Sequence, residues 1–123
     1  MLIVDDNALF RESLRDILHV RFPTLKINEA TNSEEALAKV EALAPTLIFM
    51  DISLPGENGL EVTKKLKSSH PEIVVVVLTN YDQPEYREAA FRNGANYFLS
   101  KNAPTQDLLA LVERVLSECP HIS

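Results

Sequence analysis

The run Ile73–Leu78 is apolar at every position and almost wholly β-branched, and it restricts the fold more than any other segment. A strand with one face in water alternates apolar and polar residues, whereas this run has no polar position. It therefore predicts an interior strand covered on both faces, and it excludes an edge strand facing water. Sheets of this kind are mostly parallel, with helices as the connections between strands.

Four other short apolar runs read as strands, at Leu2–Asp5, Leu25–Ala30, Leu47–Met50 and Tyr97–Leu99. Helical patterns follow each strand, and several carry start signals: Asn7, Asn32 with Glu35 three residues later, and Pro84. The apolar stripe of the second helix is predicted to be Leu37, Val40 and Leu43. Five strands alternating with five helices predict a single α/β domain with a five-stranded, doubly wound parallel sheet.

Length and charge limit what such a domain can do. The chain has 123 residues, which suits one domain, and we expect it to occupy 1–119, with 120–123 beginning a linker or tail. The formal net charge is -6, without any Lys/Arg run, so we expect no direct nucleic acid binding by this fragment.

The longest apolar run is too short to cross a membrane, and the single cysteine, Cys119, cannot form an internal disulfide. A cytoplasmic location is the default expectation. Mixed charges on the first helix, Arg11, Glu12, Arg15 and Asp16, are predicted to be a solvated face.

Polar residues stand where four of the predicted strands stop. Asp5 and Asp6 lie at the end of the first run, Asp51 follows the third, Thr79 the fourth, and Lys101 follows the fifth by one residue. Ligands of open parallel sheets bind beyond the carboxyl ends of the strands, so these side chains are expected to converge. Each residue alone has a simpler explanation, such as a helix cap, a turn or a surface lysine. Together they predict one site.

The predicted site suits metal-assisted phosphoryl transfer. Several carboxylates in one cleft repel each other and require a cation, and oxygen-only ligands favour Mg²⁺ or Mn²⁺, whereas no His or Cys spacing supports zinc. Asp51 could attack phosphorus as a nucleophile, while Lys101 neutralises the phosphoryl charge and the Thr79 hydroxyl satisfies another oxygen.

These residues resemble the receiver domain of two-component response regulators. The resemblance rests on Asp5-Asp6, Asp51 followed by Leu54-Pro55 and Asn58-Gly59, Thr79, and Lys101, and it covers essentially the whole chain. It implies a signalling phosphoacceptor, rather than an enzyme with a separate substrate, that assists its own phosphorylation and dephosphorylation. The donor would be a sensor histidine kinase or a histidine phosphotransfer protein. Asp6, Asp51 and the backbone carbonyl of Ser53 would coordinate Mg²⁺, with Asp5 assisting through water.

The same resemblance implies a switch and an output. Receiver domains couple the hydroxyl at the Thr79 position to an aromatic residue, here Phe98, which has no hydroxyl of its own to bond. Ser53 and Tyr81 would tune the lifetime of the acyl phosphate. Asn102 after the lysine, with Asn58-Gly59-Leu60-Glu61 and Tyr81-Asp82, looks more like the receivers of NarL/LuxR-type transcription factors than like the chemotaxis type. Transcription would then be controlled through an effector domain absent from this chain, and phosphorylation could produce a homodimer.

Four alternatives remain at this stage. A haloacid-dehalogenase-like phosphatase would also use Asp51, but it needs a second aspartate at the position of Ser53. A flavodoxin-like cofactor binder would place a phosphate loop where Asp5-Asp6-Asn7 would repel it. The others are a stand-alone chemotaxis-like receiver and a receiver-shaped interaction module that works without phosphorylation.

Overall fold

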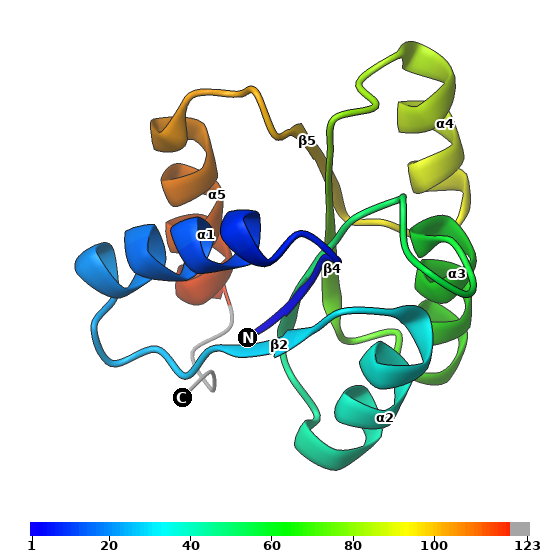
Figure 1. Ribbon diagram of the computed structural model, residues 1–123, viewed down its shortest axis with the longest axis horizontal. Coiled ribbons are helices and arrows are strands. Elements are labelled where there is room, and N and C mark those ends of the chain that lie inside the picture. The colour runs from blue at the N-terminus through cyan, green and yellow to red at the C-terminus, as the bar shows by residue number, and fades with distance from the viewer. Residues whose placement is uncertain (119–123) are drawn as a thin grey trace.

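The computed structural model describes residues 1–118, and these form a strictly alternating β/α chain (Figure 1). The predicted domain end at Cys119 and the predicted tail 120–123 lie outside the described residues. The strands are β1 (Leu2–Val4), β2 (Asn28–Ala30), β3 (Leu47–Met50), β4 (Val74–Thr79) and β5 (Tyr97–Ser100). The helices are α1 (Ala8–Arg21), α2 (Ser33–Leu43), α3 (Gly59–Ser69), α4 (Pro84–Arg92) and α5 (Thr105–Glu118).

All five strands lie parallel in one sheet, in the order β2-β1-β3-β4-β5. This confirms the predicted doubly wound α/β fold. β4 lies between β3 and β5, and Val75, Val76 and Val77 are completely buried, as expected from a run without polar positions. Because the strands are parallel, their carboxyl ends meet at one edge of the sheet.

Helices cover both faces of the sheet and create a hydrophobic core on each face. Helices α1 and α5 pack on one face and α2, α3 and α4 on the other, as Figure 1 shows. Neighbouring residues of a strand face opposite cores: Ile3 and Phe49 contact the α1/α5 side, whereas Leu2 and Ile48 contact the α2/α3 side. Both faces of the interior strands are therefore buried, which explains the lack of alternation in their sequences.

Asparagine caps begin three of the helices. The side chains of Asn7, Asn32 and Asn58 accept hydrogen bonds from the backbone N–H groups of Phe10, Glu35 and Glu61, respectively. The caps predicted at Asn7 and Asn32 are confirmed. The carboxylate of Glu35 accepts from the N–H of Thr31, one residue before the position that a capping box uses. Each cap satisfies an N–H group that the first helical turn would otherwise leave without a partner.

Two expectations for this region need correction. The second strand was predicted over Leu25–Ala30 but begins only at Asn28, because the N–H of Leu25 bonds to the carbonyl of Phe22 in a turn. Leu25 is buried by that turn, which explains its apolar character. In α2 the buried residues are Ser33, Ala36 and Val40, while Leu43 is 48% exposed. Val40 of the predicted stripe is therefore confirmed and Leu37 packs against the core, whereas Leu43 is wrong and Ala36 replaces it on the side facing the sheet.

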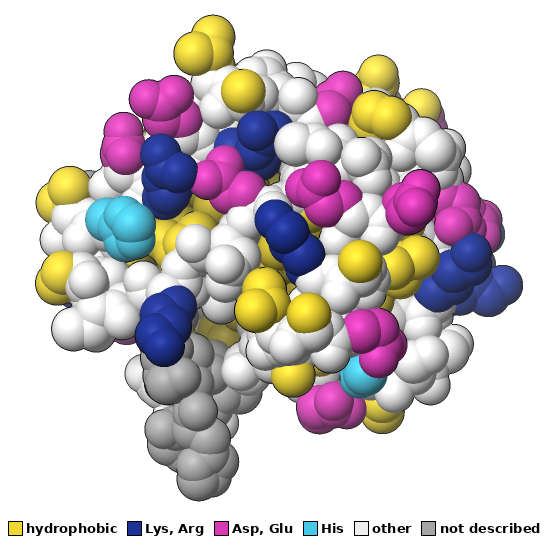
Figure 2. Space-filling view, turned by 60° about the horizontal axis from the view of Figure 1, so that its bottom comes forward, with side chains coloured by type: hydrophobic (Ala, Val, Ile, Leu, Met, Phe, Trp, Pro, Cys, Tyr) yellow, Lys and Arg dark blue, Asp and Glu magenta, His cyan; other side chains and the backbone are white. Residues whose placement is uncertain are grey.

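The molecular surface carries charges of both signs. On the face shown in Figure 2, acidic and basic side chains are interspersed, and the exposed apolar side chains are scattered. No helix within residues 1–118 is long and apolar enough to cross a bilayer.

Candidate functional site

Three strand ends bring the four charged residues of the predicted site together at the carboxyl edge of the sheet. Asp5 and Asp6 follow β1, Asp51 follows β3, and Lys101 follows β5. A cleft of about 290 Å³ opens at this edge. It is lined by the four predicted charged residues together with Asn7, Ser53, Asn80 and Tyr81.

Thr79, the last residue of β4, lies behind the cleft rather than on its wall. Its side chain is completely buried, and its hydroxyl accepts a hydrogen bond from the N–H of Tyr81 at 3.1 Å. The backbone carbonyl of Thr79 accepts from the N–H of Lys101 at 2.8 Å. The hydroxyl is therefore near the site but holds the start of the β4–α4 loop.

Three carboxylates form an acidic cluster in the cleft. Asp5, Asp6 and Asp51 each offer an oxygen, and these oxygens lie within 4.8 Å of one another. Asp5 and Asp51 are buried and Asp6 is exposed. Backbone N–H groups orient the two buried carboxylates: Asn7 donates to Asp5 at 2.8 Å and Ser53 donates to Asp51 at 3.4 Å.

A single ammonium group is shared between the two buried carboxylates. Lys101 Nζ lies 2.6 Å from Asp5 Oδ2 and 3.3 Å from Asp51 Oδ2, and the lysine side chain is only 9% exposed. The same nitrogen lies 4.4 Å from the centre of the Phe10 ring, a favourable cation–π distance. Phe10 lies in the first turn of α1 and is half-buried. No sequence signal could show that its ring would lie under this lysine.

The electrostatics of the cluster favour a divalent cation. Burial raises the pKa of Asp51, the neighbouring Asp5 raises it further, and Lys101 opposes both effects. Three ionised carboxylates and one ammonium leave a formal charge of 1 − 3 = −2 in the cleft. Oxygen donors within 4.8 Å of each other suit Mg²⁺ or Mn²⁺, so the residues present fit the expected metal. Ser53 lines the cleft, and a role for its carbonyl as a ligand stays a prediction.

The loop between β3 and α3 is fixed against Asp51 by close backbone packing. The N–H of Gly59 donates to the carbonyl of Ile52 at 2.8 Å, and a Cβ at Gly59 would lie 1.8 Å from the carbonyl oxygen of Asp51. Two residues before Gly59, the N–H of Glu57 donates to the Ser33 hydroxyl at 2.9 Å and so ties the loop to α2. The sequence contains the Asn58-Gly59 pair, but nothing in it marks Ser33 as a loop contact.

Phe98 is half-buried on the α4 side of β5. It packs against the cluster of Ile52, Val77, Ala90 and Ala95, and the Arg87 guanidinium lies 5.8 Å from its ring centre. The ring therefore connects the residue after Asp51 with α4. Its role as a switch stays a prediction.

Comparison with known proteins identifies the family. The chain matches the family described as "Response regulator receiver domain" over residues 1–113. It is 38% identical over 116 residues to the oxygen regulatory protein NreC of Staphylococcus haemolyticus strain JCSC1435, covering 94% of this chain and 54% of that protein. The chain thus spans about half the length of the curated relatives it matches.

Solved structures show the same architecture. A CheY-like receiver domain protein from Methanospirillum hungatei JF-1 superposes with a TM-score of 0.86 at 30% identity, covering 95% of this chain and 92% of that one. A LuxR-family DNA-binding response regulator from Staphylococcus aureus superposes with a TM-score of 0.84 at 25% identity, covering 93% and 96%. The similarity to a LuxR-family regulator agrees with the subfamily predicted from Asn102 and the residues after Asn58.

Proposed function

Because the chain belongs to the response regulator receiver domain family, we propose that Asp51 accepts a phosphoryl group from a sensor histidine kinase or a histidine phosphotransfer protein. The observation that carries this proposal is the sharing of Lys101 between Asp5 and Asp51, with Asp6 beside them, at the end of the sheet where ligands bind. The family match removes the support for the phosphatase and flavodoxin-like alternatives.

In the transfer step, a carboxylate oxygen of Asp51 forms a bond to phosphorus as the bond from phosphorus to the donor's histidine nitrogen breaks. The product is an acyl phosphate on Asp51, and the donor imidazole leaves with its electron pair. Lys101 moves from Asp5 and Asp51 to the phosphoryl oxygens, which it can do because its ammonium lies at the cleft wall. Thr79 donates its hydroxyl proton to another phosphoryl oxygen after its loop moves toward the cleft.

Asp5, Asp6, Asp51 and the Ser53 carbonyl would hold Mg²⁺, directly or through water. The ion supplies positive charge that lowers the repulsion between the carboxylates and the incoming phosphoryl oxygens. The same residues assist dephosphorylation, with water as the acceptor, and Ser53 and Tyr81 stand where they can control its access.

Movement of Thr79 is proposed to change the packing of Phe98 and the surface of α4 and β5, shifting a two-state equilibrium. Control of transcription through an effector domain outside this chain is a further proposal, supported by the greater length of the curated relatives. Homodimerisation on phosphorylation is proposed from the family role alone. A cytoplasmic location follows from the same role.

A phosphodonor experiment tests the central claim. The protein is incubated with phosphoramidate and MgCl₂, and its intact mass is measured. We expect a single phosphoryl adduct that requires Mg²⁺, is lost in Asp51→Asn and remains in Asp82→Asn, whose aspartate is exposed in the β4–α4 loop. Absence of an adduct with every donor tried would favour the phosphorylation-independent interaction module.

A further inference from the structure

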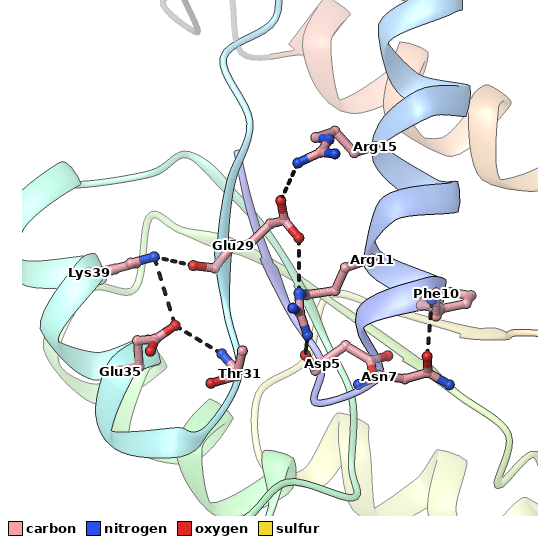
Figure 3. A network of polar contacts seen from close by, with 9 residues as sticks. All are labelled: Asp5, Asn7, Phe10, Arg11, Arg15, Glu29, Thr31, Glu35 and Lys39. Carbon is pink, nitrogen blue, oxygen red and sulfur yellow. Dashed lines mark hydrogen bonds and ion pairs between the residues drawn. The ribbon is translucent and has the colours of Figure 1, made fainter.

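A polar network joins α1 to the edge strand β2 close to the acidic cluster, and Figure 3 shows its members. Glu29, on β2, uses separate carboxylate oxygens to bind two arginines of α1: Arg11 Nε at 2.9 Å and Arg15 Nη1 at 2.7 Å. The backbone carbonyl of Glu29 also accepts from Lys39 of α2. Glu12 and Asp16 are exposed, as predicted for a solvated face, but the prediction is wrong for Arg11, which is largely covered, and it missed the pairing of both arginines with Glu29.

The two arginines differ in what else they contact. Arg11 Nη1 donates to the backbone carbonyl of Asp5 at 2.6 Å, and its side chain is 13% exposed. Arg15 is 38% exposed and bonds only Glu29 among residues 1–118. Figure 3 shows the Arg11 side chain between Glu29 and the turn that carries Asp5.

The carbonyl that Arg11 binds belongs to the peptide joining Asp5 to Asp6, two of the three cluster carboxylates. On its other side, the N–H of Asp5 donates to the carbonyl of Ala30 at 3.0 Å. Asp6 is exposed, so the orientation of the Asp5–Asp6 peptide, rather than side-chain packing, sets the direction of its carboxylate. Arg11 thus holds the one peptide whose rotation would turn Asp6 relative to Asp5.

From these contacts we infer that Arg11 is a positioning residue for the metal site, with Glu29 as its anchor. The inference rests on the proposed function, because it assigns Arg11 a role in the binding of Mg²⁺. Charge alone predicts the opposite effect on Mg²⁺ affinity. The Arg11 cation repels Mg²⁺, so loss of its charge by itself would tighten Mg²⁺ binding. Positioning and charge therefore predict opposite signs.

Three variants separate the two effects. Arg11→Lys keeps the charge but loses the fork that reaches Glu29 and the Asp5 carbonyl together. Arg11→Gln loses both. Arg15→Gln is the matched control, because it removes an arginine from the same carboxylate and leaves the Asp5 carbonyl bonded. Urea unfolding of every variant identifies any that has lost its fold.

The measurements are the Mg²⁺ dissociation constant, by calorimetric titration with MgCl₂, and the amide NMR positions of Asp6 and Asn7 without metal. We expect both Arg11 variants to bind Mg²⁺ roughly tenfold more weakly, the range found when groups that support metal ligands are lost. We expect Arg15→Gln to bind about as tightly as the wild type. The amides of Asp6 and Asn7 should move in the Arg11 variants only.

Wild-type affinity in Arg11→Lys together with tighter binding in Arg11→Gln would overturn the inference, since charge alone would then explain both results. Equal weakening in Arg15→Gln would also overturn it, because loss of the Asp5 contact would not be the cause. A wild-type chain that binds no Mg²⁺ would overturn the proposed function, and the inference with it.

Discussion

The substitution Asp51→Asn is expected to stabilise the metal-free protein at neutral pH. The oxygens of Asp5, Asp6 and Asp51 lie within 4.8 Å of one another, so each neighbour repels Asp51 by about 3.5 kcal/mol at an effective dielectric of about 20. Lys101, at 3.3 Å, attracts it by about 5 kcal/mol on the same scale. Water weakens the repulsion between the exposed Asp6 and Asp51. Desolvation of the ionised Asp51 carboxylate, however, destabilises the folded wild type further. We expect the free energy of unfolding to rise by about 1–2 kcal/mol.

The pH dependence of this effect has a definite sign. The pKa of Asp51 is raised above its ordinary value of 3.8, first by burial and then by Asp5, so the folded protein binds this proton more tightly than the unfolded chain does. Wild-type stability therefore falls, relative to Asp51→Asn, as the pH rises from 3.8 to the folded pKa. The advantage of the variant should be absent in acid and constant above the folded pKa.

Urea unfolding in EDTA, repeated across this pH range, measures the effect, with the exposed Asp16→Asn as a control for loss of one negative charge. MgCl₂ should then narrow this difference. At ten times the dissociation constant it would stabilise the wild type by about 1.4 kcal/mol, and it should have less effect on a variant lacking one ligand. The reasoning is refuted if Asp51→Asn is no more stable than the wild type in EDTA at neutral pH, or if Asp16→Asn gains as much.

Three further substitutions test the surroundings of the site. Gly59→Ala should lower the free energy of unfolding, measured in urea, by about 1–3 kcal/mol, because its Cβ would lie 1.8 Å from the carbonyl oxygen of Asp51. Alanine in an ordinary helix raises the free energy of unfolding, and such a rise here would contradict the prediction. Phe49 is 1% exposed, so Phe49→Ala should lower the free energy of unfolding by about 3–5 kcal/mol in the same assay. A decrease below about 1 kcal/mol would mean that the core beneath α1 and α5 rearranges to fill the space. Tyr81→Ala should speed the loss of the phosphoryl group from Asp51, because the Tyr81 ring lines the cleft through which water arrives. The rate is measured from the intact mass over time, and an unchanged rate would mean that the ring does not shield the acyl phosphate from water.

The sheet was predictable because its physical signal is local. A strand covered on both faces cannot alternate, so Ile73–Leu78 indicated an interior position, and Val74–Thr79 occupies one. The failure at Leu25 has an equally physical cause. A turn and an edge strand can both bury an apolar side chain, and the sequence does not distinguish them.

The chemical groups of the site were predictable, but the contacts that orient them were not. Asp5, Asp51 and Lys101 were expected to meet because parallel strands place their carboxyl ends together, and they do. Phe10 and Arg11 belong to α1, and their contacts depend on how that helix is rotated against the sheet. That rotation is set by tertiary packing, for which no short segment carries a signal.

The sharing of Lys101 suggests why one lysine can serve both states of the site. In the metal-free cleft its ammonium offsets part of the repulsion between Asp5 and Asp51, so the buried carboxylates are tolerable without an ion. A divalent cation on the same carboxylates would take over that role and leave the ammonium available for phosphoryl oxygens. Lys101→Met should therefore destabilise the metal-free protein far more than the Mg²⁺-loaded one, and unfolding in EDTA and in MgCl₂ measures this difference. An equal loss in both conditions would mean that the lysine stabilises the fold through packing on Phe10 rather than through its charge.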